Sequence, residues 1–250
     1  MINRYWQDKL CIIVLESPYQ NLSLQEARVV FSNIIDVKIQ GYTHIHEDGV
    51  LPVDTTDFLG THLIVANREN PFEDIYMSYK SISYKTCEKY NVPFPFLTLL
   101  QNHAHKECAM EMERILKECK SKGEDLAYNT GLTMNPKIRN DENLRKILKE
   151  MITTFVVNYH NIYEIPHWAT LGICKVKTDQ YFIKMGLKEI SNNPLMSHPY
   201  LKQAESRAVI SMNQEYSDYV FHTAEKYQGL WDNRITINLN NYHNLKKQAA

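Results

Sequence analysis

The sequence lacks the features that mark several large classes of protein. Its formal net charge is −1 and no long run of like charge occurs, so the clustered Lys/Arg surface that phosphate contacts require is missing. We therefore expect no nucleic-acid partner. The apolar run Leu10–Leu15 is too short to cross a membrane, and it lacks the flanks of a signal peptide. We expect no membrane span.

Paired cysteines and two catalytic signatures are also missing. The five cysteines are odd in number and show no C-x-x-C spacing, which is typical of free thiols in a reducing compartment, and we expect a cytoplasmic protein. No G-x-S-x-G elbow and no G-x-G-x-x-G loop occurs, so hydrolase and dinucleotide functions lack support. The H-x-H pairs His44–His46 and His103–His105 have no evident third ligand, and we expect no metal.

What is present indicates one globular domain. The chain is 44% hydrophobic and 23% charged, which is normal for a globular protein with a proper core. No repeat or low-complexity linker divides it, so we predict one domain over 1–237 and a flexible tail over 238–250. Strand and helix patterns alternate, which favours an α/β or α+β fold.

Periodicity predicts the individual elements. The expected strands are Leu10–Leu15, Thr61–Asn67, Asp74–Tyr84, Leu126–Met134, Ala169–Cys174, Leu187–Ile190 and Glu205–Asn213. The expected helices are one capped by Ser23 with Glu26, then His105–Lys120, Asn143–Tyr159, Val176–Met185 and Tyr216–Tyr227. A polar loop is expected over Gly41–Asp57.

The turn between Met134 and Asn143 is the first candidate site. Backbone N–H groups at a helix start attract anions, but this turn has no glycine and carries Asp141 and Glu142. Two like charges ~4 Å apart repel by about 1 kcal/mol in water and by roughly 4 kcal/mol at a partly buried site. Tight binding of a diphosphate is therefore disfavoured, whereas a single phosphate needs fewer contacts and is repelled less by the two acids. An ordinary strand-to-helix turn is the alternative.

Two motifs over roughly 123–190 resemble the GCN5-related N-acetyltransferase superfamily. Met134-Asn135-Pro136-Lys137-Ile138-Arg139 is similar to its "V-x-P-x-x-R" turn, and Tyr181-Phe182-Ile183-Lys184-Met185-Gly186-Leu187 to its "Y-x-K-x-G-F" segment. Upstream, Arg28 and Phe31 on a first helix, followed by Asp54-Thr55-Thr56-Asp57, resemble the autoinducer (acyl-homoserine-lactone) synthases and long-chain N-acyl amino acid synthases. Pro52 stands where that family has Glu. The family also has a Glu and an Arg on the strand before the phosphate turn, but the corresponding positions here are near Tyr128 and Gly131, so the pair is absent.

The resemblance implies a mixed, mostly antiparallel sheet flanked by helices, and an N-acyltransferase that moves an acyl group, plausibly long, to a small amino-acid-like amine. The donor would be an acyl carrier protein pantetheine thioester or acyl-CoA, so acyl carrier protein is an expected partner. A conventional acetyl-CoA-dependent N-acetyltransferase and a non-catalytic binding protein of the same fold are the alternatives. The catalytic candidates are Asp54, Asp57, Glu124 and Tyr181. The donor-binding candidates are Leu132, Thr133, Met134, Arg139, Asn140, Asn143 and Leu144.

Overall fold

The computed structural model of the 250-residue chain describes residues 4–44, 53–198, 201 and 204–239. These residues form two compact units. Unit 1 contains residues 1–81, 131–154 and 223–250, and unit 2 contains residues 82–130 and 155–222. Strand β4 (Leu126–Met134) and helix α8 (Glu142–Ile162) each run from one unit into the other.

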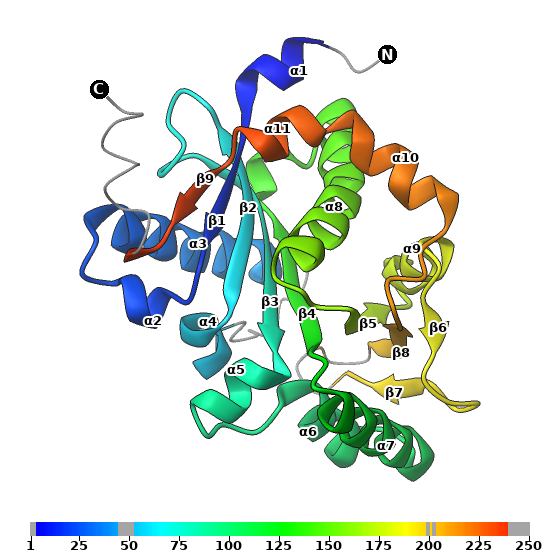
Figure 1. The fold of residues 1–250 in the computed structure, drawn as a ribbon. Coiled ribbons are helices and arrows are strands. Elements are labelled where there is room, and N and C mark those ends of the chain that lie inside the picture. Colours follow the sequence, from blue (N-terminus) through cyan, green and yellow to red (C-terminus); the bar gives the residue numbers. More distant parts are fainter. Residues whose placement is uncertain (1–3, 45–52, 199–200, 202–203, 240–250) are drawn as a thin grey trace. The chain divides into compact units, whose positions relative to one another are not determined.

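The elements follow one another along the chain as shown in Figure 1. The first part contains α1 (Arg4–Lys9), β1 (Leu10–Leu15), α2 (Pro18–Asn21), α3 (Gln25–Thr43), α4 (Thr55–Leu59), β2 (Thr61–Asn67) and β3 (Ile75–Ser83). The middle adds α5 (Tyr84–Lys89), α6 (Pro95–His103), α7 (Lys106–Lys122), the 3-10 turn η1 (Pro136–Ile138) and β5 (His167–Ile173). The last part contains α9 (Thr178–Lys184), β6 (Lys188–Glu189), β7 (Leu195–Ser197), β8 (Glu205–Ser211), α10 (Asp218–Lys226), α11 (Gln228–Asp232) and β9 (Ile235–Ile237).

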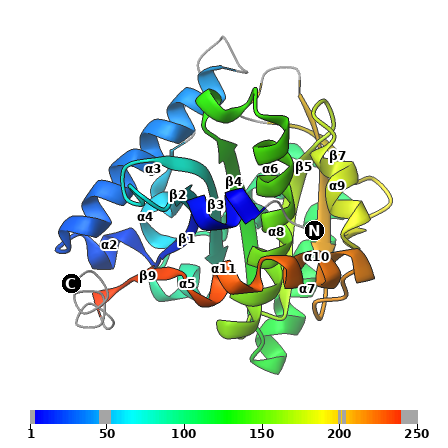
Figure 2. The ribbon, with the colours of Figure 1, turned by 90° about the horizontal axis from the view of Figure 1, so that it is seen from above.

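In unit 1, β1 is the central strand between β2, to which it is antiparallel, and β9, to which it is parallel. Strand β3 pairs antiparallel with β2 on the other side. Every residue of β1 is buried, because both faces of the strand are covered. Figure 2 shows α3 on one side of β1 and α11 on the other. Burial on both faces explains why β1 is a continuous apolar run rather than an alternating one.

The core of unit 1 lies between α3 and these strands. Ala27, Val30 and Ile34 line one face of α3, at the i, i+3 and i+7 positions that share a helical face. They pack against Ile13 and Ile64, among others, from the alternate positions of β1 and β2.

In unit 2, β8 pairs antiparallel with β5, β6 and β7. Strand β5 pairs parallel with the start of β4, from Leu126–His167 to Tyr128–Ala169. The pairing is thus mostly antiparallel in the strands of both units, as predicted. Helix α7 ends at Gly123, whose φ of 70° is a left-handed C-cap.

Strands 10–15, 61–67 and 126–134 and the long helix around 143–159 were predicted correctly. The predicted N-cap of the first helix was wrong, because Leu24 rather than Ser23 caps it. The helix also continues through Gly41 to Thr43, where a loop was predicted. The Asp54–Asp57 segment belongs to the short helix α4, which was not predicted. His46 and Pro52 lie outside the described residues.

The beginning of the predicted flexible tail is anchored. Asn238 Nδ2 donates to Glu16 Oε2 at 2.8 Å, and the Leu239 N–H donates to Asn21 Oδ1 at 2.7 Å. Residues 240–250 lie outside the described part of the chain. Among the described residues, no helix is both long enough and apolar enough to cross a membrane.

Gly172 sets how closely α9 packs on β5. A Cβ on Gly172 would lie 2.3 Å from the Cα and 2.6 Å from the backbone N of Asp179. Because these are backbone atoms, α9 would have to move, and we expect Gly172→Ala to destabilise the protein by about 1–3 kcal/mol. Gly229→Ala is the control, since a Cβ there meets nothing within 4 Å. Urea unfolding of both variants checks this, and equal midpoints would contradict it.

Candidate functional site

Strand β4 stops pairing with β5 halfway along its length. Their parallel register ends at Tyr128–Ala169, although β4 continues to Met134 and β5 to Ile173. The first four residues of β4 are buried, whereas Thr130, Gly131 and Leu132 are half-buried. Gly131 also has a positive φ of 64°, which breaks the regular strand and favours glycine. Over these residues the backbone of β4 is therefore not paired with β5.

The turn after β4 uses some of its amides internally and leaves others open. The Lys137 N–H donates to Asn135 Oδ1 and the Leu144 N–H to Asp141 Oδ1, at 3.1 and 2.8 Å. Asp141 is thus a helix N-cap. Within the described residues, the backbone N–H groups of Asn140, Glu142 and Asn143 have no acceptor. These amides can bind a small anion, but the carboxylates of Asp141 and Glu142 lie in the same turn and would repel it.

The donor-binding candidates differ in their surroundings. Thr133 is buried, and its Oγ1 lies 2.3 Å from where a Cβ on Gly41 would be. Arg139 Nη2 donates to the carbonyl oxygen of Gly41 at 2.8 Å, so its guanidinium joins the turn to the end of α3. The side chain of Leu144 belongs to the core. Leu132 and Met134 are half-buried, and Asn140 and Asn143 are exposed.

Asp54 and Asp57 form the capping box of α4. The Thr56 N–H donates to Asp54 Oδ1 at 2.7 Å, and the Asp54 N–H donates to Asp57 Oδ2 at 2.9 Å. This reciprocal arrangement is what D-x-x-D spacing produces at a helix start. The two carboxylates differ in exposure: the Asp54 side chain is 60% exposed and that of Asp57 is fully buried.

Two buried lysines face Asp57. Lys38 Nζ from α3 donates a hydrogen bond to Asp57 Oδ1, and Lys80 Nζ from β3 lies 3.1 Å from Asp57 Oδ2. Lys38 and Lys80 are only 1% and 2% exposed. Lys80 Nζ also reaches Asp54 Oδ1 at 3.2 Å and Thr56 Oγ1 at 2.6 Å. We call Lys38, Asp54, Asp57 and Lys80 the lysine–aspartate cluster. Such burial of charge is rare without pairing.

Burial and charge shift the pKa values in and around this cluster. Burial alone would raise the pKa of Asp57, but Lys80 and Lys38 outweigh it and hold that pKa at about 2. Burial, followed by the repulsion of Lys80, lowers the pKa of Lys38 against the opposing effect of Asp57. Burial also lowers the pKa of His62 to about 4. Its Nε2 lies 2.8 Å from the Asp57 carbonyl oxygen.

The sequence reasoning missed both lysines. Lys38 stands four residues after Ile34, on the apolar face of α3, and Lys80 is a charged residue within the buried stretch Met77–Ile82 of β3. A lysine at a core position is the signal that would have identified them.

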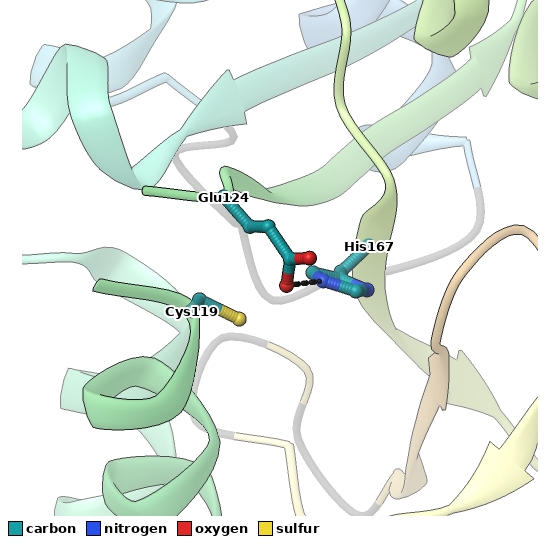
Figure 3. A group of neighbouring side chains, drawn as sticks. All are labelled: Cys119, Glu124 and His167. Atoms are coloured by element: carbon teal, nitrogen blue, oxygen red, sulfur yellow. Dashed lines mark hydrogen bonds and ion pairs between the residues drawn. The ribbon is translucent and has the colours of Figure 1, made fainter. Parts of the chain in front are cut away.

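Glu124 lies in unit 2, just before β4, in the group drawn in Figure 3. Its Oε2 is 2.9 Å from His167 Nε2, and the Cys119 sulfur lies nearby, with the three ligand atoms within 4.8 Å of one another. His167 Nδ1 accepts the Asn213 N–H at 3.0 Å, so Nε2 carries the proton and donates it to Glu124. A metal-binding histidine instead donates from its second ring nitrogen. This donor set therefore fits a metal poorly.

A buried polar network lies at the point where β4 leaves β5. His160 Nε2 is 3.2 Å from Asn129 Nδ2, and His160 Nδ1 is 3.4 Å from the Tyr216 hydroxyl. Trp168 Nε1 donates to the same hydroxyl at 2.9 Å. Burial lowers the pKa of His160 to about 3, so the imidazole is neutral at physiological pH.

Tyr181 is half-buried on α9 in unit 2. The neighbouring Phe182 is buried, and its ring packs edge-on against Trp168 with centroids 5.9 Å apart. Phe182 is therefore a core residue, and Tyr181 remains the acid candidate of this segment.

The sequence matches no protein-family model and no curated protein. The fold, in contrast, is similar to that of a CoA-dependent acyl-homoserine lactone synthase, BjaI, with SAM and isopentyl-CoA, at a TM-score of 0.51 and 11% identity over 91% of this chain and 92% of that one. For FeeM, an N-acyl amino acid synthase from uncultured soil microbes, the TM-score is 0.48 and the sequence identity 15%, over 83% of this chain and 92% of that one. For the AHL synthase LasI, the TM-score is 0.47 and the sequence identity 9%, over 82% of this chain and 92% of that one.

The predicted fold class is therefore confirmed. The chain has the mixed α/β, mostly antiparallel architecture predicted for an acetyltransferase-type fold, and this fold is similar to that of BjaI. The resemblance that the sequence motifs indicated holds at the level of the fold.

Proposed function

We propose that the protein is an N-acyltransferase that moves an acyl group from a pantetheine thioester to the amine of a small, amino-acid-like acceptor. The observation that carries this proposal is the half-buried stretch Thr130–Leu132, where β4 has left β5 and Gly131 departs from strand geometry. An extended pantetheine arm can hydrogen-bond to such a backbone as an added strand would. The shared fold with BjaI supports the same chemistry.

The turn after β4 favours a donor with one phosphate. The open amides of Asn140, Glu142 and Asn143 can bind an anion, whereas the Asp141 and Glu142 carboxylates oppose a second phosphate. The phosphopantetheine of an acyl carrier protein has one phosphodiester, while coenzyme A adds a diphosphate. We therefore propose acyl carrier protein as the preferred donor and partner, with acyl-CoA as the weaker donor. The five free cysteines fit the cytoplasm, where such donors occur.

The reaction would be aminolysis. The amine loses a proton, its nitrogen attacks the thioester carbon, and the thiolate leaves. Backbone N–H groups of Leu132 to Met134 are the proposed oxyanion donors. With a pKa of about 2, Asp57 is too weak a base for an amine, so we assign Asp54 and Asp57 to binding and positioning. Glu124 and Tyr181 remain the proposed secondary groups.

Thiol release tests the proposal. Purified protein is incubated with acyl carrier protein thioesters or acyl-CoA, with and without a pool of amino acids, and free thiol and acylated amine are measured. We expect amine-dependent release, faster from the carrier protein. Release from acetyl-CoA alone would indicate a conventional N-acetyltransferase, and donor binding without any release a non-catalytic protein.

A charge variant tests the place of the phosphate. Asn143→Asp adds a third carboxylate to the turn and is expected to raise the KM for the donor about fivefold, with kcat unchanged, since like charges repel by about 1 kcal/mol in water. Asn161→Asp, on an exposed position of α8, is the matched control. An unchanged KM in Asn143→Asp would remove the turn from the donor site.

A further inference from the structure

Within the lysine–aspartate cluster, the two amines have different numbers of acceptors. Lys80 Nζ has three oxygen acceptors, on Asp54, Thr56 and Asp57, which match the three protons of an ammonium group. Among the described residues, Lys38 Nζ has one, Asp57 Oδ1. With a single fully buried carboxylate between two buried amines, the geometry favours an ammonium at Lys80 and a neutral amine at Lys38.

Lys38 also lies against Gly131, in the half-buried part of β4. A Cβ on Gly131 would be 3.4 Å from Lys38 Nζ and 3.5 Å from its Cε. Because Gly131 has no side chain, the backbone of β4 can approach the amine closely. Lys38 itself is buried, whereas its neighbours on β4, Thr130 and Leu132, are half-buried. A small group bound along β4 would therefore exchange its proton with Nζ through one water.

We propose that Lys38 is the catalytic base that takes the proton of the acceptor amine, an assignment that rests on the proposed acyl transfer. The acceptor enters as an ammonium ion. Lys38 Nζ takes one proton, and the freed lone pair attacks the thioester carbonyl carbon. As the C–N bond forms, the C–S bond breaks. Of the other two protons, one stays on the amide nitrogen and one goes to the leaving thiolate. Lys38 returns its proton to solvent.

The surrounding charges suit this role. The titratable groups around Lys38 are Asp57 and Asp54 from the start of α4, Lys80 from β3 and His62 from β2; Tyr42 of α3 interacts with the same two aspartates. Asp57 stabilises the Lys38 ammonium once it has formed, and Lys80 prevents Asp57 from taking the proton instead. Burial lowers the pKa of Lys38, and a buried lysine is a known form of general base.

Lys38→Met tests the role, because it removes the base and leaves Asp57 paired with Lys80. We expect kcat to fall about 10²- to 10⁴-fold. In the wild type kcat should rise with pH to a plateau, whereas the residual rate of Lys38→Met should keep rising as the free amine deprotonates in solution. Lys226→Met, whose side chain is 45% exposed in the same unit, is the control and should leave kcat unchanged.

A second readout does not depend on turnover. The lysine side-chain NMR signal that disappears in Lys38→Met is followed with pH in the wild type, and it should titrate below the exposed lysines. If the Lys38 signal titrates at the same pH as the exposed lysines, or if Lys38→Met is fully active, the proposal is overturned. Neither result would contradict the acyl transfer itself. A wild type that releases no thiol would end the proposed function, and the base assignment with it.

Discussion

Asp57→Asn is expected to lower the free energy of unfolding by about 3–5 kcal/mol. The substitution leaves Lys38 and Lys80 without their shared buried carboxylate, and removing one partner of a buried ion pair has an effect of this size. Asparagine preserves the shape of the side chain and can still accept a hydrogen bond from the Asp54 N–H. The decrease in the free energy of unfolding therefore measures the effect of removing the charge. Urea unfolding at neutral pH measures it.

Two further variants isolate the cause. Glu142→Gln removes a carboxylate that is 88% exposed, and it should change the free energy of unfolding by less than about 0.5 kcal/mol. Adding Lys38→Met to Asp57→Asn removes one of the two stranded amines, so the double variant should be more stable than Asp57→Asn alone. If Asp57→Asn unfolds at the same urea concentration as the wild type, the cluster is not the buried ion-pair system described above.

Acid is expected to destabilise the protein well before its carboxylates titrate. The buried imidazoles of His62 and His160 have pKa values of about 4 and about 3, below the unfolded value of 6.5. As the pH falls below about 6.5, the unfolded chain binds protons that the folded chain does not. Their neutral forms therefore contribute full stability above that pH, and the contribution is lost down to the folded pKa values.

The slope follows from the number of groups. Each histidine contributes about 1.4 kcal/mol per pH unit inside its window, so both together give roughly 3 kcal/mol per unit between about pH 5.5 and 4.5. Asp57, with a pKa of about 2, adds to this loss only below about pH 4. Urea midpoints between pH 7 and 4.5 measure the slope.

One histidine can be removed at a time. His160→Gln can still form a hydrogen bond with Asn129 and is expected to halve the slope, whereas His222→Gln should not change it because His222 is exposed. A stability that stays constant from pH 7 to 4.5 would show that neither imidazole is held neutral by the fold.

Periodicity identified most of the elements because it is a local property of the chain. The apolar runs of β1 and β2 and the i, i+3, i+4 pattern of α8 each contain their own signal. The fold class was readable from two motifs, the 134–139 turn and the 181–187 segment. The end of α3 was not readable, since the contacts of Thr133 and Arg139 with Gly41 come from a distant part of the chain.

The sequence by itself determined where the longer strands and helices lie and which turn follows β4, but it predicted a loop where Asp54 and Asp57 cap α4. Only the tertiary structure decided what those aspartates do, because Lys38 and Lys80 reach them from an earlier helix and a later strand. Local patterns carry no information about such pairing, since it depends on how separate elements pack. The same packing places Lys38 beside Gly131 and turns a lysine on an apolar helix face into the proposed base.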